Sequence, residues 1–421
     1  MKDKLIQLLR WSERYTKTDM VYMASGAFWG NLNGLFLAFL SLVTSILFAR
    51  FLTKEAFGTY QYVLAIGGLI TAITLTGMNT AVTRAVARGF EGDYKKSVKY
   101  QLKFGIIAML VSFAIAGWYY TKGNTDLGLS FLWIGLFMPA ANALNTWAAY
   151  MGGKKFFKIG TRYGFINMSV TYIGIIVVLY VTQSFVWVIF ANFFFGLLSN
   201  IIIYFLIARR FEINDATDPE TIPYGNHLTV MAIPGFIATQ IDALLIFQFI
   251  GPAPLAVYSF ATIIPEKLAG MLKFIPNIAL PKLSEKTPKE VGQILFKRIW
   301  VILAFLGLIA FAYAELAPFF FKIFFPQYTA SVPYTQIYAL SFFSVGAVFV
   351  QTALVSQQKV KELYIVNTSM PFLKTILLVV LMYFYGIWGI LWAQIIIHII
   401  SIPLQLYLYK RSLMILYSHE K

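Results

Sequence analysis

Four ionisable residues interrupt two apolar stretches in the second half of the chain. Asp242 lies within IATQIDALLIF, and Glu266, Lys267 and Lys273 lie within the next apolar stretch. An ionisable side chain at the centre of a membrane span costs about 2.5–3.5 kcal/mol on insertion scales, so it usually faces a cavity or a partner. We therefore expect Asp242 to couple transport to an ion. The alternative is that it pairs with a lysine to hold helices together.

The second of these stretches combines charge with proline. Glu266 and Lys273 are seven residues apart, which places them on one face of a helix. Pro265 lies beside them and Pro276 follows Lys273, so we expect a bend, because proline removes a backbone hydrogen bond. A bent helix with two lysines suits a gate. The alternative for Lys267 and Lys273 is that their side chains reach toward the cytoplasmic interface.

Several kinds of chemistry are missing from the sequence. The chain has no Cys, which excludes disulfides, iron–sulfur clusters and thiol nucleophiles. It has no phosphate-binding G-x-x-x-x-G-K-[ST] loop and no H-E-x-x-H zinc motif. The three histidines, His227, His398 and His419, are too scattered to form a metal site. We therefore expect no enzyme activity, no cofactor and no metal.

The composition is that of a polytopic membrane protein. Hydrophobic residues make up 59% of the 421 residues and charged residues 12%, against about 45–50% and about 25% in soluble domains. A span needs about 20 mostly apolar residues, and the chain offers enough for twelve helices. The predicted spans are 20–49, 56–83, 104–121, 127–153, two within 163–208, 228–250, 255–280, 299–321, 334–356, 362–384 and 387–409. We place a turn at 182–184 and the last boundary near Gly386.

The distribution of basic residues tests this count. With the N-terminus inside, only Arg50, Lys54, Lys122 and Lys322 of the 34 Lys and Arg fall outside. Lys267, Lys273 and Lys374 fall within spans, which leaves 27 on the inner side. This split follows the positive-inside rule and predicts a multi-pass protein of the cytoplasmic (inner) membrane with both termini cytoplasmic. The net charge of +16 is then a topology signal, and we expect no nucleic-acid partner.

Polar segments divide the chain. Leu5, Leu8, Leu9 and Trp11 among basic residues predict an amphipathic helix on the inner leaflet within 1–19. The most polar internal stretch follows the sixth helix and reads as a linker between halves. The expected organisation is a cytoplasmic N-terminus (1–19), a six-helix bundle (20–208), a cytoplasmic linker (209–226), a second six-helix bundle (227–409) and a cytoplasmic tail (410–421).

A weak internal repeat supports two halves. At an offset of 198 residues, ARFLTKEAFGTYQY (49–62) falls on FQFIGPAPLAVYSF (247–260), and AVTRA (81–85) falls on ALPKL (279–283). Because each half has an even number of helices, both have the same orientation. The repeat is therefore parallel, with its axis along the membrane normal. We expect a monomer, since the two halves already supply the pseudo-symmetry.

Two stretches resemble a known family. The segment ARFLTKEAFGTYQYVLAIGGLI, with GMNTAVTRAVARG after it, resembles the opening signature of bacterial polysaccharide-export flippases. QIDALLIFQFIGPAPLAVYSFA and IALPKLSE resemble the family's second-half segments. This family is the polysaccharide-transport branch of the multidrug/oligosaccharidyl-lipid/polysaccharide exporter superfamily. The sequence departs from the usual pattern at Thr53-Lys54, where Gly-Pro is commoner, and at Ala256, where Gly is usual.

The resemblance implies an all-α fold of two six-helix bundles that form a V around a cavity. It implies a polyprenyl-diphosphate-linked oligosaccharide as substrate, moved from the inner to the outer leaflet by alternating access. Partners would be the lipid bilayer, a proton or sodium ion, and glycan-assembly enzymes. Candidate substrate-binding residues are Lys267, Lys273, Arg84, Arg88 and Arg50, and candidate ion-coupling residues are Asp242 and Glu266.

Two other functions stay open. The first is a drug or cation antiporter of the related multidrug branch, whose sites usually favour carboxylates. The second is a non-transporting scaffold for glycan assembly. The charges within the spans argue against a scaffold, because they are costly when no substrate uses them. For Arg84 and Arg88, anchoring at the inner interface is the alternative to substrate contact.

Overall fold

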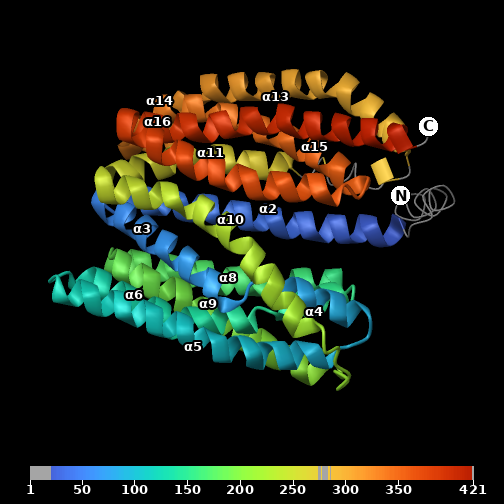
Figure 1. Cartoon of the computed structure of the whole chain (residues 1–421). Helices are drawn as coiled ribbons and strands as arrows, with labels where there is room; N and C mark the ends of the chain where they lie inside the picture. Colours follow the sequence, from blue (N-terminus) through green and yellow to red (C-terminus); the bar gives the residue numbers. More distant parts are fainter. Residues whose placement is uncertain (1–19, 274–275, 277–282, 285, 420–421) are drawn as a thin grey trace, which may run out of the picture. The chain divides into compact units, whose positions relative to one another are not determined.

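The protein is helical throughout the part that the structure describes. This computed structural model describes residues 20–273, 276, 283–284 and 286–419, and Figure 1 shows the helices in chain order. Among those residues, eleven helices are long and apolar enough to cross a membrane, and the last of them spans 55 residues. This confirms the predicted fold class. The predicted amphipathic helix within 1–19 lies outside the described residues.

The helices have the following bounds. They are α2 (Met20–Phe51), α3 (Lys54–Thr71), η1 (Ala72–Thr74), α4 (Met78–Ala87), α5 (Gly92–Thr121), α6 (Thr125–Leu144), α7 (Trp147–Gly153), α8 (Phe157–Thr182), α9 (Phe185–Arg210), α10 (Thr221–Phe249), α11 (Pro252–Leu272), α13 (Pro288–Phe324), η2 (Pro326–Ser331), α14 (Val332–Tyr338), η3 (Ala339–Phe342), α15 (Phe343–Ser356) and α16 (Val360–His419). The predicted turn at 182–184 separates α8 from α9, with Gln183 in the left-handed region at φ 49°.

The 198-residue repeat reappears in the helix boundaries. Helix α2 ends at Phe51 and α10 ends at Phe249, which is 198 residues later. Helix α3 begins at Lys54 and α11 begins at Pro252, again 198 residues later. The turn between the first two helices therefore falls at equivalent positions in both halves. The weak sequence match thus reflects a structural repeat.

Two predicted spans are broken helices. Within 56–83 the chain passes from α3 through η1 to Leu75, whose left-handed backbone (φ 61°) interrupts the helix before α4 begins at Met78. Within 127–153, α6 ends at Leu144 and α7 begins at Trp147, although Asn145 and Thr146 between them keep helical dihedral angles. The break at Leu75 leaves backbone amides without a partner in the helix. One of them, the Gly77 amide, donates to Thr229 Oγ1 of α10 (3.1 Å).

The last two spans form a hairpin within α16. A straight helix of 55 residues would be about 80 Å long, far more than a bilayer needs. Gly386 has φ 56° and ψ −134°, a conformation that few other residues adopt. A Cβ atom at Gly389 would overlap the Leu381 carbonyl oxygen. The chain therefore reverses here, at the predicted boundary.

The chain separates into two compact units, 25–256 and 257–421 together with 1–24. Helix α10 belongs to the first of these, the N-terminal unit, because it packs against α3 and α4. Each unit has its own apolar core. Met78, Tyr94 and Tyr150 are fully buried in the first, and Val291, Val350 and Tyr409 in the second.

The segment between α9 and α10 is docked onto the N-terminal unit. Asp93, fully buried at the start of α5, accepts hydrogen bonds from the Asp218 amide (2.9 Å) and the Thr221 hydroxyl (2.7 Å). The Asn214 side chain accepts a hydrogen bond from the Glu91 amide (3.2 Å). These contacts join the segment to the α4–α5 corner, which explains why α10 belongs to this unit.

A close backbone approach explains one glycine of the family-like signature. A Cβ atom at Gly58 would overlap the carbonyl oxygen of Pro252, the first residue of α11. No side chain fits there, so the Phe57-Gly58-Thr59-Tyr60 pattern requires glycine. The equivalent residue 198 positions later is Ala256, which is fully buried.

Candidate functional site

Three basic side chains come together within the C-terminal unit. Lys273 follows the last residue of α11, and its amide donates to the Ala269 carbonyl (2.9 Å). The charges of Lys374 and Lys273 both act on the His398 ring. We call these three residues the cation cluster, in which the two lysines carry the positive charge. Basic groups gathered within a membrane protein are costly, so the arrangement favours an anion.

The hairpin within α16 positions two members of the cluster. Lys374 lies twelve residues before Gly386, and His398 lies twelve residues after it. At about 1.5 Å per residue, both lie about 18 Å from the turn along their helices. They therefore occupy the same level of the two helices, where their side chains can share one ligand.

Glu266 adds one carboxylate near the cluster. Its Oε1 accepts a hydrogen bond from the Tyr338 hydroxyl (3.2 Å), which links α11 to α14. Its charge also attracts Lys273, two turns along the chain. Lys267, the neighbour of Glu266, is exposed on α11. Glu266 thus offsets part of the positive charge and leaves a net cationic group.

The cation cluster has the chemistry of a phosphate or diphosphate site. Hydrogen bonds from charged donors to phosphate oxygens are about twice as strong as neutral ones. Lysine binds phosphate as a point charge, and histidine can donate from either ring nitrogen. Within the described residues, no group of three or more His, Cys, Asp or Glu has the arrangement of a metal site.

Asp242 belongs to the other unit. It lies on α10 and is only 9% exposed, and its Oδ1 accepts a hydrogen bond from the Ala243 amide (2.9 Å). Further along α10, Gln248 donates to the Tyr62 hydroxyl (2.7 Å), which is also bonded to the Tyr119 hydroxyl (2.7 Å). Asp242 is thus a buried carboxylate within α10 of the N-terminal unit.

The predicted arginines lie at helix ends. Arg50 is exposed in the last turn of α2. The Arg84 guanidinium lies 5.0 Å from the centre of the Tyr224 ring. Arg88 forms an ion pair with Asp218 (2.8 Å). Arg84 of α4 and Arg88 just after it therefore contact the start of α10 and the docked segment, which gives each of them a structural partner.

Sequence reasoning missed Lys374 and His398 as site residues. Lys374 was recognisable as a charge inside a span, and His398 entered only as a metal ligand too far from other histidines. The signal that connects them is their equal separation from Gly386. That separation becomes informative once the glycine is known to be a turn.

The sequence matches the model of a family described as "Polysaccharide biosynthesis protein" over residues 23–286. The matched region is more than half of the chain. Among curated proteins, none matches the sequence.

Solved exporter structures share the fold. The chain is similar to "Lipid II flippase MurJ, inward closed conformation" with a TM-score of 0.63 and 14% identity, covering 90% of this chain and 87% of that one. It is similar to an outward-facing multidrug resistance MATE family transporter of the MOP superfamily (TM-score 0.62, 11% identity, 94% and 96% covered). It is also similar to the Vibrio cholerae MATE transporter VcmN in the bent form (TM-score 0.54, 14% identity, 94% and 98% covered). At these identities the likeness establishes the fold.

Proposed function

Because the chain belongs to the polysaccharide biosynthesis protein family, we propose that it is a flippase for a polyprenyl-diphosphate-linked oligosaccharide. It moves this lipid from the inner to the outer leaflet of the cytoplasmic membrane for surface polysaccharide synthesis. It acts as a transporter and not as an enzyme. The observation that carries the proposal is the cation cluster of Lys273, Lys374 and His398.

The physical problem of such a substrate matches this site. A diphosphate and a row of sugar hydroxyls cannot cross hydrocarbon unaided. The cation cluster holds the diphosphate in place of water, and Lys267 adds a further positive charge on α11. The polyprenyl tail stays in lipid while the polar part crosses. The fold shared with the lipid II flippase MurJ supports this assignment.

Alternating access requires an energy source, and Asp242 is the group we assign to it. A buried carboxylate that takes up a proton or a sodium ion changes charge inside the membrane, and this change biases one conformation over another. Glu266 is the second candidate, because its charge interacts with that of Lys273, so its protonation would change the charge available to a phosphate.

A gene deletion tests the proposal. The deletion strain should accumulate lipid-linked oligosaccharide on the inner leaflet and lose surface polysaccharide. The wild-type gene should restore export, and Lys273→Gln and Lys374→Gln should not, although both proteins reach the membrane. Lys122→Gln, which removes the same charge from the loop between α5 and α6, is the matched control and should restore export.

A drug or cation antiporter is the second candidate. It is favoured by the MATE-like fold and by the carboxylates Asp242 and Glu266. In that case the deletion strain accumulates no lipid-linked oligosaccharide and becomes sensitive to cationic dyes. The two candidates thus give opposite results in the same strain.

A further inference from the structure

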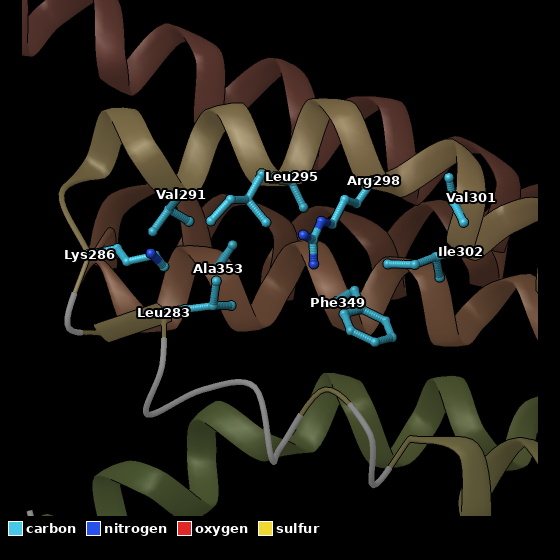
Figure 2. A pocket seen from close by; sticks show the side chains of 10 residues that line it. Leu283, Lys286, Val291, Leu295, Arg298, Val301, Ile302, Phe349 and Ala353 are labelled. Carbon is cyan, nitrogen blue, oxygen red and sulfur yellow. The ribbon is translucent and has the colours of Figure 1, made fainter. Parts of the chain in front are cut away.

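An apolar groove with two basic residues lies within the C-terminal unit, and no member of the cation cluster is among the residues that line it. It has a volume of about 590 Å³, within the usual range for ligand sites. Figure 2 shows Val291, Leu295 and Arg298 of α13 pointing toward Phe349 and Ala353 of α15. The groove therefore runs along the N-terminal part of α13, between two helices. The positive-inside topology assigns this end to the cytoplasmic side.

Two cations mark the groove, Lys286 just before α13 and Arg298 on it. In the described part of the chain, neither forms an ion pair with a carboxylate. Lys286 acts on Glu290 at a distance. However, the Glu290 carboxylate accepts hydrogen bonds from the Thr287 amide (2.9 Å) and hydroxyl (3.0 Å), which cap the helix. The groove thus presents the charge of Arg298, while Glu290 offsets part of the charge of Lys286.

The position of Arg298 along α13 matches the edge of the hydrocarbon. Lys297 and Arg298 are the last charged residues before Glu315, so 299–314 carry no charge. Such a boundary places Arg298 at the level of lipid headgroups and Val301 in the acyl region. Val301 is 68% exposed, so the groove is open along this side.

The lining also excludes a sugar ligand. Among the residues that the structure describes, the groove is lined apart from the two cations by Leu, Val, Ile, Ala and Phe, without an amide or hydroxyl side chain. An oligosaccharide needs many such partners, because each buried unpaired hydroxyl is costly. Phosphate with an attached hydrocarbon chain fits both parts of the lining. Basic pockets between transmembrane helices on the cytoplasmic side bind anionic headgroups in this way.

We propose that this groove binds an anionic phospholipid of the inner leaflet. Its phosphate lies at Arg298 and Lys286, and one acyl chain runs past Val301, Ile302 and Phe349. The inference does not depend on the transported substrate. It adds a second lipid site whose occupant stays in its own leaflet.

Lipid titration of the purified full-length protein in detergent tests the proposal. Phosphatidylglycerol should bind more tightly than phosphatidylcholine, measured by native mass spectrometry. Arg298→Gln and Lys286→Gln should each weaken phosphatidylglycerol binding about five-fold, since one basic residue near anionic lipid contributes about 1 kcal/mol. Val301→Trp, which fills the open side, should abolish binding of both lipids.

Lys297→Gln is the matched control, because it removes the same charge one residue away and does not line the groove. It should leave lipid binding unchanged, and a thermal melt should show every variant folded. Equal binding of the two phospholipids, or an equal loss in Lys297→Gln, would overturn the proposal. Displacement of phosphatidylglycerol by tighter-binding polyprenyl diphosphate would also overturn it and assign the groove to the transported lipid.

Discussion

The helix pairs α2–α3 and α10–α11 are the two copies of the repeat. They share the position of the turn between their helices, but they differ in charge. Helices α2–α3 and α10–α11 end and begin at positions 198 residues apart. In the second copy these helices and the residue after them carry Asp242, Glu266, Lys267 and Lys273. The first copy has Thr44, Gly68, Leu69 and Leu75 at the equivalent positions. The same fold therefore forms without these charges.

This difference separates structural residues from functional ones. The Thr44 hydroxyl donates to the Leu40 carbonyl of its own helix (2.8 Å), which needs no partner elsewhere. Leu75 is 8% exposed and packs in the core of the N-terminal unit. Because the first copy has neutral residues at these positions, we propose that the charges of the second copy serve transport.

The largest effect is expected where the copies come close together. Gly58→Leu places a side chain against the Pro252 carbonyl, and we expect a loss of about 3 kcal/mol in stability, at the upper end for overpacking. A thermal melt of the purified protein measures it. Gly235→Ala, on α10 with open space around the glycine, is the control and should not lower stability. An unchanged melt for Gly58→Leu would mean that the two segments separate easily.

Making the second copy resemble the first should remove export. Lys273→Leu gives the second copy the residue found at the equivalent Leu75. Loss of a charged contact to phosphate costs about 2 kcal/mol or more, so export should fall about 30-fold while the protein stays folded. The reciprocal change Leu75→Lys in that variant should not restore export. Restoration would show that the two copies are interchangeable.

Asp242→Asn should uncouple transport with a smaller effect on its rate. We expect export to fall about ten-fold and to lose its response when the ion gradient is collapsed. Adding Thr44→Asp, the equivalent position in the first copy, should not restore that response. If Asp242→Asn export still responds to the gradient as wild type does, coupling resides elsewhere and Glu266 becomes the candidate.

The smallest effect is expected for Arg88→Gln. The Arg88 side chain is 52% exposed in its ion pair with Asp218, and such pairs contribute about 0–1 kcal/mol. Export and stability should change less than about two-fold and 1 kcal/mol, measured in the same assays. A collapse of export with intact folding would instead make Arg88 a substrate contact.

Sequence patterns predicted the features that depend on local chemistry. The turn at 182–184, the reversal at Gly386 and the repeat offset all follow from short signals in the chain. The break at Leu75 carries no such signal, because an apolar residue inside an apolar stretch indicates a continuous helix. The docking of 211–220 depends on Asp93, whose partners lie more than 120 residues away.

The residues of the candidate site stand out in the sequence only in part, for the same reason. Lys273 and Glu266 stand out because charge is rare in spans, and the structure brings them together on α11 and the residue that follows it. Lys374 and His398 join Lys273 through the tertiary packing of α16, which no local pattern encodes. Arg88 shows the converse. Its position at the inner end of a helix suggested contact with the substrate, and in the structure its guanidinium forms an ion pair with Asp218.

Reconstituted transport tests the central claim most directly. Purified protein in liposomes should move a fluorescent polyprenyl-diphosphate-linked oligosaccharide between leaflets, measured by protection from a membrane-impermeant quencher. The account predicts transfer by wild type and by Lys122→Gln, and transfer reduced about 30-fold or more in the Lys273→Gln/Lys374→Gln double variant. Equal transfer by the folded double variant and the wild type would contradict the assignment of the cation cluster as the diphosphate site.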